Sequence, residues 1–163
     1  MSLTFDEAMA THLRNATLLM NKHNIKGTFY VNTITGIDWN KNLPGWSRAV
    51  SNGHEIGNHT DQHPCACRHT FGINQQHCLE RLSMADIEQI IDGASKTLRR
   101  EFSGGLVDRS FAYPCFETFV GNEKDSYVPE VAKRYLTGRI GENRETFPIR
   151  RIYICLIPSP WKE

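Results

Sequence analysis

Residues 53 to 63 read Gly-His-Glu-Ile-Gly-Asn-His-Thr-Asp-Gln-His, and this stretch decides the predicted fold. Its first half, 53–58, has the composition of a β-strand, and His59 and His63 follow that strand four residues apart. Two imidazoles at this spacing can point to the same side of a helical turn and, with a nearby carboxylate, hold a divalent ion that keeps positions open for water and substrate. The stretch therefore predicts a metal site at the end of a strand.

Working outward from this strand, short apolar runs alternate with segments of helical spacing. The strand candidates are 2–5, 27–31, 53–58, 110–113, 136–140 and 151–157, and the helix candidates are 9–24, 44–52, 83–102 and 127–135. Such alternation predicts an α/β fold with a mostly parallel sheet, either open and doubly wound or curled into a barrel. Functional side chains of parallel sheets lie at the carboxyl ends of the strands, where this chain carries Asp6-Glu7, His59 and Tyr113-Pro114.

The helix predicted over 83–102 has the clearest start. Ser83 and Asp86 have the spacing of a capping box, and the isoleucines and leucine that follow form an apolar stripe. The preceding stretch from 64 to 82 is irregular, and we expect it to be an unusually long loop between a strand and its helix.

Three segments at the strand ends carry a family resemblance: Leu3 to Glu7 (LTFDE), 53–63 with its His-Thr-x-x-His, and Phe111 to Pro114 (FAYP). Together with Gly27 to Val31 (GTFYV), they resemble the motifs of the polysaccharide deacetylase family, also called the NodB-homology or carbohydrate esterase family four domain. The resemblance implies an incomplete or distorted (β/α) barrel of parallel strands alternating with helices. It extends to about residue 140, so we expect a deacetylase-like domain over 1–141 and a C-terminal segment, 142–163, that has no match to the family.

The resemblance also assigns roles to individual residues. It implies that His59, His63 and Glu7 hold a divalent metal, with zinc as the favoured ion, and that Asp6 is the general base. In the third motif, Tyr113 and Pro114 would contact substrate. The backbone N–H of Cys115, directly after this motif, would stabilise the oxyanion. The implied function is a metal-dependent hydrolase that removes acetyl groups from an N-acetylated polysaccharide such as peptidoglycan, a chitin-like glycan or xylan.

Several departures from the family pattern keep a second function open. Glu7 is one methylene longer than the expected aspartate, Ala112 replaces an arginine often found in the third motif, and Phe116 replaces its closing glycine. No histidine follows His77, so the family's C-terminal general-acid histidine has no counterpart, and a closed barrel typically needs about 200 residues or more. The alternative is a truncated, catalytically silent domain that binds metal or glycan. With either function, the exposed strand edges of an incomplete barrel would favour self-association. Simpler roles also remain open: hydrogen bonding for the two histidines, and a helix N-cap for Asp6.

The cysteines and tryptophans allow further alternatives. Cys65, Cys67 and Cys78, with His69 and His77, could form a structural zinc site, contain a disulfide from Cys65 or Cys67 to Cys78, or remain free thiols. Trp39 and Trp46 are candidates for stacking on sugar rings or for packing between strand and helix.

Charge and hydropathy exclude two classes of partner. The net charge of +1 argues against the basic surface needed to bind nucleic acid or an anionic membrane without specificity. The longest apolar stretches, such as 152–158, are too short to span a bilayer, and no targeting segment is visible. Members of the family mostly act outside the cytoplasm, but the odd number of cysteines, five, does not fix the compartment.

Overall fold

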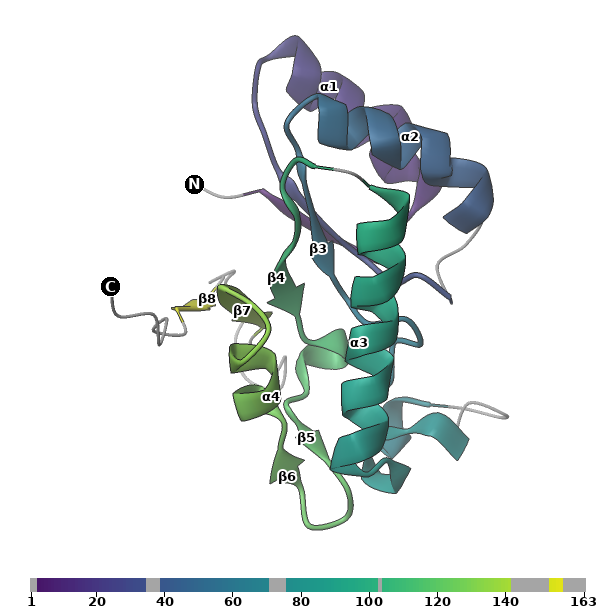
Figure 1. Cartoon of the computed structure of the whole chain (residues 1–163), viewed down its shortest axis with the longest axis vertical. Helices are drawn as coiled ribbons and strands as arrows, with labels where there is room; N and C mark the ends of the chain where they lie inside the picture. The colour runs from purple at the N-terminus through teal and green to yellow at the C-terminus, as the bar shows by residue number, and fades with distance from the viewer. Residues whose placement is uncertain (1–2, 35–38, 71–75, 103, 142–152, 157–163) are drawn as a thin grey trace.

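A six-stranded sheet forms the centre of the computed structural model, which describes residues 3–34, 39–70, 76–102, 104–141 and 153–156. The strands lie in the order β1 (Thr4–Asp6), β2 (Thr28–Val31), β3 (Glu55–Asn58), β4 (Val107–Ala112), β7 (Thr137–Ile140) and β8 (Tyr153–Leu156). The first five are parallel, and β8 pairs antiparallel with β7 (Figure 1). The five parallel strands form a curled half-barrel, which confirms the predicted incomplete (β/α) barrel. The domain boundary at 141 and self-association through strand edges stay predictions.

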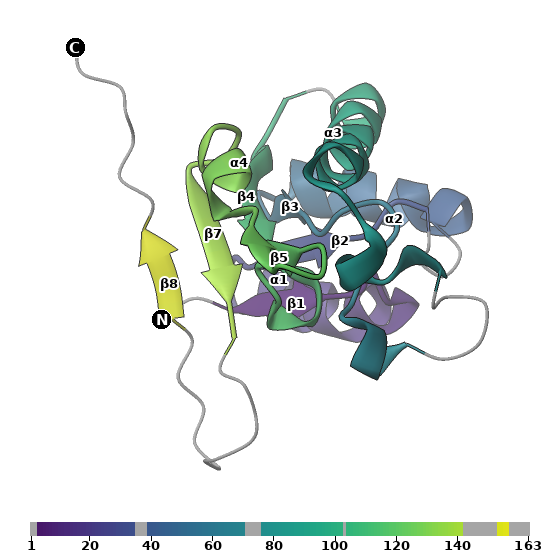
Figure 2. The same cartoon turned by 90° about the horizontal axis from the view of Figure 1, so that it is seen from below.

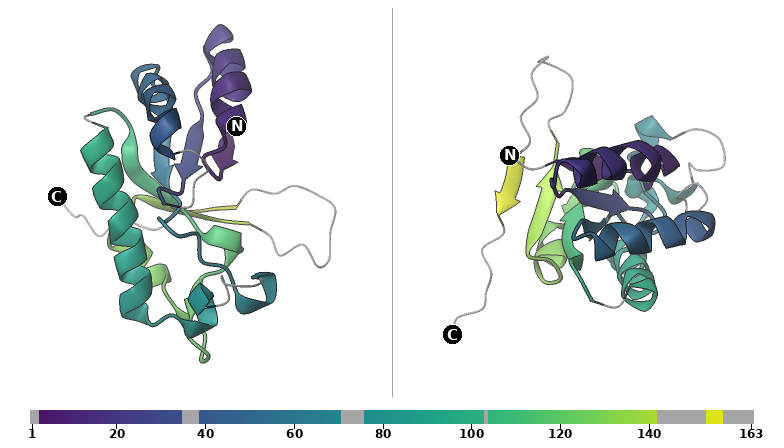
Figure 3. Two further views of the ribbon diagram at one scale, coloured as in Figure 1. Left: turned by 90° about the vertical axis from the view of Figure 1, so that its right-hand side faces the viewer. Right: turned by 90° about the horizontal axis from the view of Figure 1, so that it is seen from above.

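Helices flank the curled sheet. They are α1 (Thr17–Lys22), preceded by a π-helical segment (His12–Ala16), α2 (Trp39–Ser51), α3 (Met84–Glu101) and the short α4 (Val128–Ala132). Figure 3 shows α1, α2 and α3 following one another around the sheet, and Figure 2 shows the same arrangement from below. No described helix is long and apolar enough to cross a membrane.

Most predicted elements are present, but several have bounds that differ from the prediction. Helix α2 begins at Trp39 and contains Pro44, which the sequence suggested as its first residue. Helix α4 ends at Ala132, and the predicted strand at 110 already begins at Val107 as β4. A hairpin of β5 (Phe119–Val120) and β6 (Asp125–Ser126) was not predicted.

The strands alternate between an apolar outer face and a polar inner face. Phe29 of β2 and Ile56 of β3 are fully buried and pack in one cluster with Trp46 of α2 and Leu98 of α3. A second buried cluster joins Phe111 of β4 to the first half of α3 and to the α4 segment. Because α3 contributes to both clusters, it fixes α2 and α4 to the same sheet.

Glu55 organises the inner face of the sheet. Its carboxylate accepts hydrogen bonds from Thr28 Oγ1 at 2.9 Å and from Ser110 Oγ at 2.7 Å, so it joins β2, β3 and β4. Beside it, a side chain at Gly57 would meet the Tyr30 ring, because an added Cβ would lie 2.5 Å from that ring. The inner face is therefore filled by polar and aromatic side chains that lead to the carboxyl end of the sheet.

The N-terminus of α3 has the predicted capping box. The Asp86 backbone N–H donates to Ser83 Oγ at 3.2 Å, and the Ser83 N–H donates to the Asp86 carboxylate at 2.8 Å. The predicted stripe is buried as expected and consists of Ile87, Ile90, Ile91, Ala94 and Leu98.

Shortening Leu98 tests how much α3 contributes to the fold. Because its side chain is fully buried, Leu98→Ala is expected to lower the free energy of unfolding by about 2–5 kcal/mol. Urea unfolding followed by circular dichroism measures this. Leu18→Ala removes the same atoms at a site that is 64% exposed and should change stability by less than about 0.5 kcal/mol. Equal losses in both variants would contradict this account of the core.

Candidate metal and catalytic site

The three predicted ligand residues converge at the carboxyl ends of β1 and β3. The Nε2 atoms of His59 and His63 lie 3.1 Å apart, and Oε1 of Glu7 lies 2.9 Å from Nε2 of His63 and 4.0 Å from Nε2 of His59. In a tetrahedral zinc site with bonds of about 2.0–2.1 Å, neighbouring ligand atoms are about 3.3 Å apart. The donor atoms therefore have both the chemistry and the approximate spacing of a site with two histidines and one carboxylate.

His59 is oriented by a hydrogen bond to the neighbouring strand. Its ring is almost completely buried, and Nδ1 donates to the backbone carbonyl of Ala112 at 2.8 Å. This tautomer leaves the lone pair on Nε2, which faces His63 and Glu7, as is common for histidine ligands of metals. Burial, and then the nearby His63, lower the pKa of His59 to about 4, so the ring is neutral at pH 7.

A tight turn, and not the helical turn that the spacing suggested, places His63 beside His59. The Thr60 N–H donates to the side-chain oxygen of Asn58 at 2.7 Å, and the His63 N–H donates to Thr60 Oγ1 at 2.9 Å. Thr60 and His63 have left-handed backbone conformations, with φ of 65° and 53°. The side chains of this motif therefore shape its own backbone.

Asn58 anchors that turn in a buried polar network. Its amide nitrogen lies 2.8 Å from the Tyr135 hydroxyl and 3.1 Å from Ser95 Oγ, and Ser95 donates to Asp108 at 3.0 Å. Because these groups are buried, each depends on the others for its hydrogen bonds.

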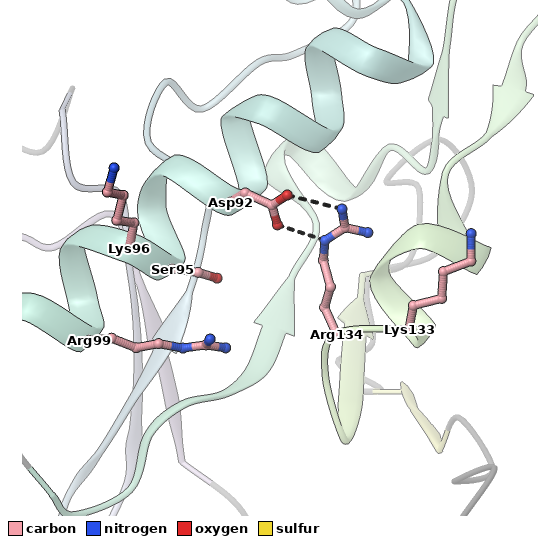
Figure 4. Close-up of a pocket in the computed structure, with 6 residues that line it drawn as sticks. All are labelled: Asp92, Ser95, Lys96, Arg99, Lys133 and Arg134. Carbon is pink, nitrogen blue, oxygen red and sulfur yellow. Dashed lines mark hydrogen bonds and ion pairs between the residues drawn. The ribbon is translucent and has the colours of Figure 1, made fainter.

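A surface pocket lies above this network, between α3 and the segment after α4. Figure 4 shows its lining residues: Asp92, Ser95, Lys96, Arg99, Lys133 and Arg134. The Arg134 guanidinium donates to both oxygens of Asp92 at 2.7 and 3.1 Å, and Arg99 donates to Asp108 at 2.8 Å. These ion pairs join α3 to its neighbours, and none of the predicted site residues lines the pocket.

Asp6 forms an ion pair that the sequence did not reveal. Both oxygens of its carboxylate accept a hydrogen bond from Nη2 of Arg139 on β7. The guanidinium carbon lies 5.1 Å from the centre of the Tyr30 ring and 5.9 Å from that of Phe116. The first helix begins at Ala10, so Asp6 is not its N-cap. The one local signal for Arg139 is a charged residue inside a predicted strand, and it does not identify a partner 133 positions away.

Glu7 reaches the histidines from an exposed position. Its backbone has a φ of 78°, and its side chain is 48% exposed. The hydrogen bond with His63 lowers the pKa of the Glu7 carboxyl, which is therefore ionised at neutral pH. The extra methylene relative to aspartate does not prevent contact with His63.

The third motif lies on the other side of His59. Tyr113 and Pro114 are buried, so their contact with substrate stays a prediction. Cys115 follows with a φ of 51° and forms a disulfide with Cys65. Its proposed contribution, a backbone N–H donated to an oxyanion, also remains a prediction.

The disulfides decide among the alternatives for the cysteine-rich loop. Cys67 is bonded to Cys78, which confirms one of the two predicted pairings, whereas Cys65 pairs with Cys115 and not with Cys78. Sulfurs in disulfides are not thiolate ligands, so the alternative of a structural zinc site is wrong for this oxidised state. Trp39 and Trp46 are buried in the core, which supports packing and excludes stacking on a sugar.

Comparison with known proteins places these motifs in a family. The family model described as Polysaccharide deacetylase matches residues 1–117, and the chain belongs to this family. A comparison with curated protein sequences finds no match.

Solved structures share the fold. The Xyl-CE4 domain of a multidomain xylanase from the hindgut metagenome of Trinervitermes trinervoides has a TM-score of 0.60 and 17% identity, and the match covers 86% of this chain and 57% of that chain. The chitin deacetylase of the fungal pathogen Colletotrichum lindemuthianum has a TM-score of 0.53 and 23% identity, with 70% and 45% covered. A family pseudoenzyme from Bacillus anthracis has a TM-score of 0.52 and 22% identity, with 70% and 34% covered. The match therefore spans between one third and three fifths of the length of these three chains.

The lowered pKa of His59 predicts a pH effect in metal-free protein. Because the unfolded state binds a proton near pH 6.5 and the folded state near pH 4, the stability contributed by neutral His59 is lost as the pH falls through this window. Nitrogen-detected NMR at pH 6 should show His59 neutral and protonated at Nδ1. A His59→Ala spectrum assigns the signal, and titration near pH 6.5 would contradict the buried, hydrogen-bonded geometry.

Removing the guanidinium at position 139 tests the Asp6 ion pair. Arg139→Gln should lower the free energy of unfolding by about 1–3 kcal/mol, because it leaves a partly buried carboxylate without its partner. Arg139→Lys keeps the charge but lacks the planar guanidinium that lies over the Tyr30 and Phe116 rings, so it should recover only part of the loss. A double-mutant cycle with Asp6→Asn, measured by urea unfolding, isolates the pair, and additive effects would show that it contributes nothing.

Proposed function

We propose that this chain contains the metal-binding part of a hydrolase that removes acetyl groups from an N-acetylated polysaccharide. The convergence of Glu7, His59 and His63 at one strand-end site supports this proposal, because these are the residues that the family resemblance assigns as ligands. The substrate class rests on the family and on the chitin deacetylase that shares the fold.

Glu7 Oε1 and the two histidine Nε2 atoms would hold the ion. Two imidazole nitrogens and one carboxylate oxygen suit zinc, and we propose zinc as the ion. When bound, the ion supplies Lewis acidity and lowers the pKa of water. Neutral His59 and ionised Glu7 already have the protonation states that ligands require.

Asp6 would act as the general base. It lies next to Glu7 in the sequence, and Nη2 of Arg139 donates to both of its carboxylate oxygens and so restricts its orientation at the carboxyl end of β1. In that position it can accept a proton from the attacking water and later return it to the leaving amine. The Cys115 backbone N–H would donate to the oxygen that becomes negative on the acetyl carbon, and Tyr113 and Pro114 would hold substrate beside it.

A catalytically silent, metal- or glycan-binding domain is the second candidate. Glu7 favours it, because the resemblance implies an aspartate at this position and the longer side chain alters the coordination of the ion. One structure with the same fold is described as a pseudoenzyme.

Metal content and acetate release distinguish the two functions. We expect near-stoichiometric zinc in purified wild type and Asp6→Asn, and none in His59→Ala/His63→Ala, as measured by elemental analysis. Acetate release from chitin oligomers, peptidoglycan and acetylated xylan should fall at least about 100-fold in Asp6→Asn.

The control is His23→Ala/His77→Ala, which removes two exposed histidines outside the site and should keep the metal. Equal metal loss in the Asp6 variant would refute its assignment as the base. Bound metal without turnover on any glycan would favour the silent domain, and metal retained in the His59/His63 double variant would refute the ligand set.

A further inference from the structure

The His63 ring lies between two groups of potential ligands. Its Nε2 faces His59 and Glu7, whereas its Nδ1 lies 3.6 Å from the sulfur of Cys65. That sulfur is bonded to Cys115, so the disulfide joins the loop after β3 to the loop after β4. Donor atoms of His63, Cys65 and Cys115 all lie within 4.8 Å of one another.

We propose that reduction of the Cys65–Cys115 disulfide creates a second metal site, in which both thiolates and Nδ1 of His63 bind a thiophilic ion such as Zn²⁺ or Cd²⁺. Reduction by a dithiol breaks the S–S bond, transfers two electrons and two protons to the cysteines, and converts the dithiol to its cyclic disulfide. Metal binding then releases the thiol protons. The competition described below rests on the proposed hydrolytic site, but formation of the thiolate site does not.

The backbone already holds the two cysteines close enough to share an ion. Their Cα atoms are 5.5 Å apart, and Zn–S bonds of about 2.3 Å let two thiolates bind one ion with their sulfurs slightly less than 4 Å apart, roughly tetrahedral spacing. Cys65 is buried and Cys115 is half-buried, so a reductant reaches the bond from the Cys115 side. The sulfurs therefore need to separate by only about 2 Å to become ligands.

The second site draws on the same imidazole as the first. A neutral histidine has one lone pair, so binding through Nδ1 leaves Nε2 protonated and unable to serve as a ligand beside His59. Thiolates are also softer ligands than the Glu7 carboxylate and favour zinc and cadmium. The redox state of Cys65–Cys115 would therefore decide which set of donors holds the metal.

The second disulfide provides a matched control. Cys67–Cys78 has the Glu80 carboxylate as its neighbouring potential ligand, and no described histidine joins that group. The Glu80 carboxylate accepts a hydrogen bond from the Cys67 N–H at 2.6 Å. Cys67→Ser/Cys78→Ser and Cys65→Ser/Cys115→Ser thus each keep one disulfide and the same remaining cysteine, Cys155.

The test is Cd²⁺ titration followed by the ultraviolet absorption of cadmium–thiolate bonds, before and after reduction with a water-soluble phosphine. The phosphine contributes no thiolate, and it takes up oxygen from water as it reduces the disulfide. We expect reduced Cys67→Ser/Cys78→Ser to bind Cd²⁺ at 1:1 stoichiometry, and reduced Cys65→Ser/Cys115→Ser to bind at least about 10-fold more weakly. Equal binding by the two variants, or none after reduction, would overturn the proposal.

Two further variants are made in the Cys67→Ser/Cys78→Ser background. Both keep Cys65 and Cys115, so this test does not depend on whether the chain folds without these two cysteines. His63→Ala should weaken Cd²⁺ binding at least about 10-fold, whereas His59→Ala should not weaken it, because His59 belongs only to the competing set of donors. No effect of His63→Ala would remove the imidazole from the site and overturn the proposal.

If His59→Ala abolishes zinc binding in the oxidised protein but leaves cadmium binding in the reduced protein, the two sites are separately established. If oxidised wild type binds no zinc while the reduced protein binds cadmium, only the proposed hydrolytic function fails.

Discussion

The Asp6–Arg139 ion pair connects β1 to β7, the two outer parallel strands of the sheet. Three strands lie between them in the hydrogen-bonded order, so a flat sheet would keep these side chains too far apart to touch. The contact therefore requires the curl of the half-barrel and in turn stabilises it. The rings of Tyr30 and Phe116 flank the guanidinium, which binds well to aromatic faces and to a carboxylate at the same time.

Left-handed backbone conformations are concentrated near the carboxyl ends of β1, β3 and β4. Among the described non-glycine residues with positive φ, those near the site are Glu7, Ala8, Thr60, His63, Cys115 and Phe116. Each such conformation costs of order 1–3 kcal/mol and persists only when its surroundings hold it. Here the Asn58 and Thr60 hydrogen bonds hold the β3 loop, and the Cys65–Cys115 bridge ties it to the β4 loop. The two buried clusters along α3 supply the stability that offsets this strain.

Local pattern was enough to predict the strands of the main sheet and the α3 capping box, and it placed Glu7 and His59 at one edge of the sheet, whereas their role as ligands with His63 came from the family resemblance. Each prediction from local pattern depends on residues close in sequence or on the rule that parallel strands end at one edge. Arg139 and the Cys65–Cys115 bridge were missed because their partners lie 133 and 50 positions away, and neither charge nor cysteine spacing selects a partner at that range. The start of α2 was misplaced because proline favours the first turn of a helix, whereas Pro44 lies inside this one.

Gly57 shows how the inner face constrains variation in the motif that precedes His59. An added Cβ would lie 2.5 Å from the Tyr30 ring and 2.8 Å from Ser110 Oγ, both of which lie on neighbouring strands. A larger residue at position 57 would displace the Tyr30 ring, whose centre lies 5.1 Å from the guanidinium carbon of Arg139. Positions 30 and 57 should therefore change together during evolution: a chain that gains a side chain at 57 has to accept a smaller one at 30, and to stabilise its arginine by other means.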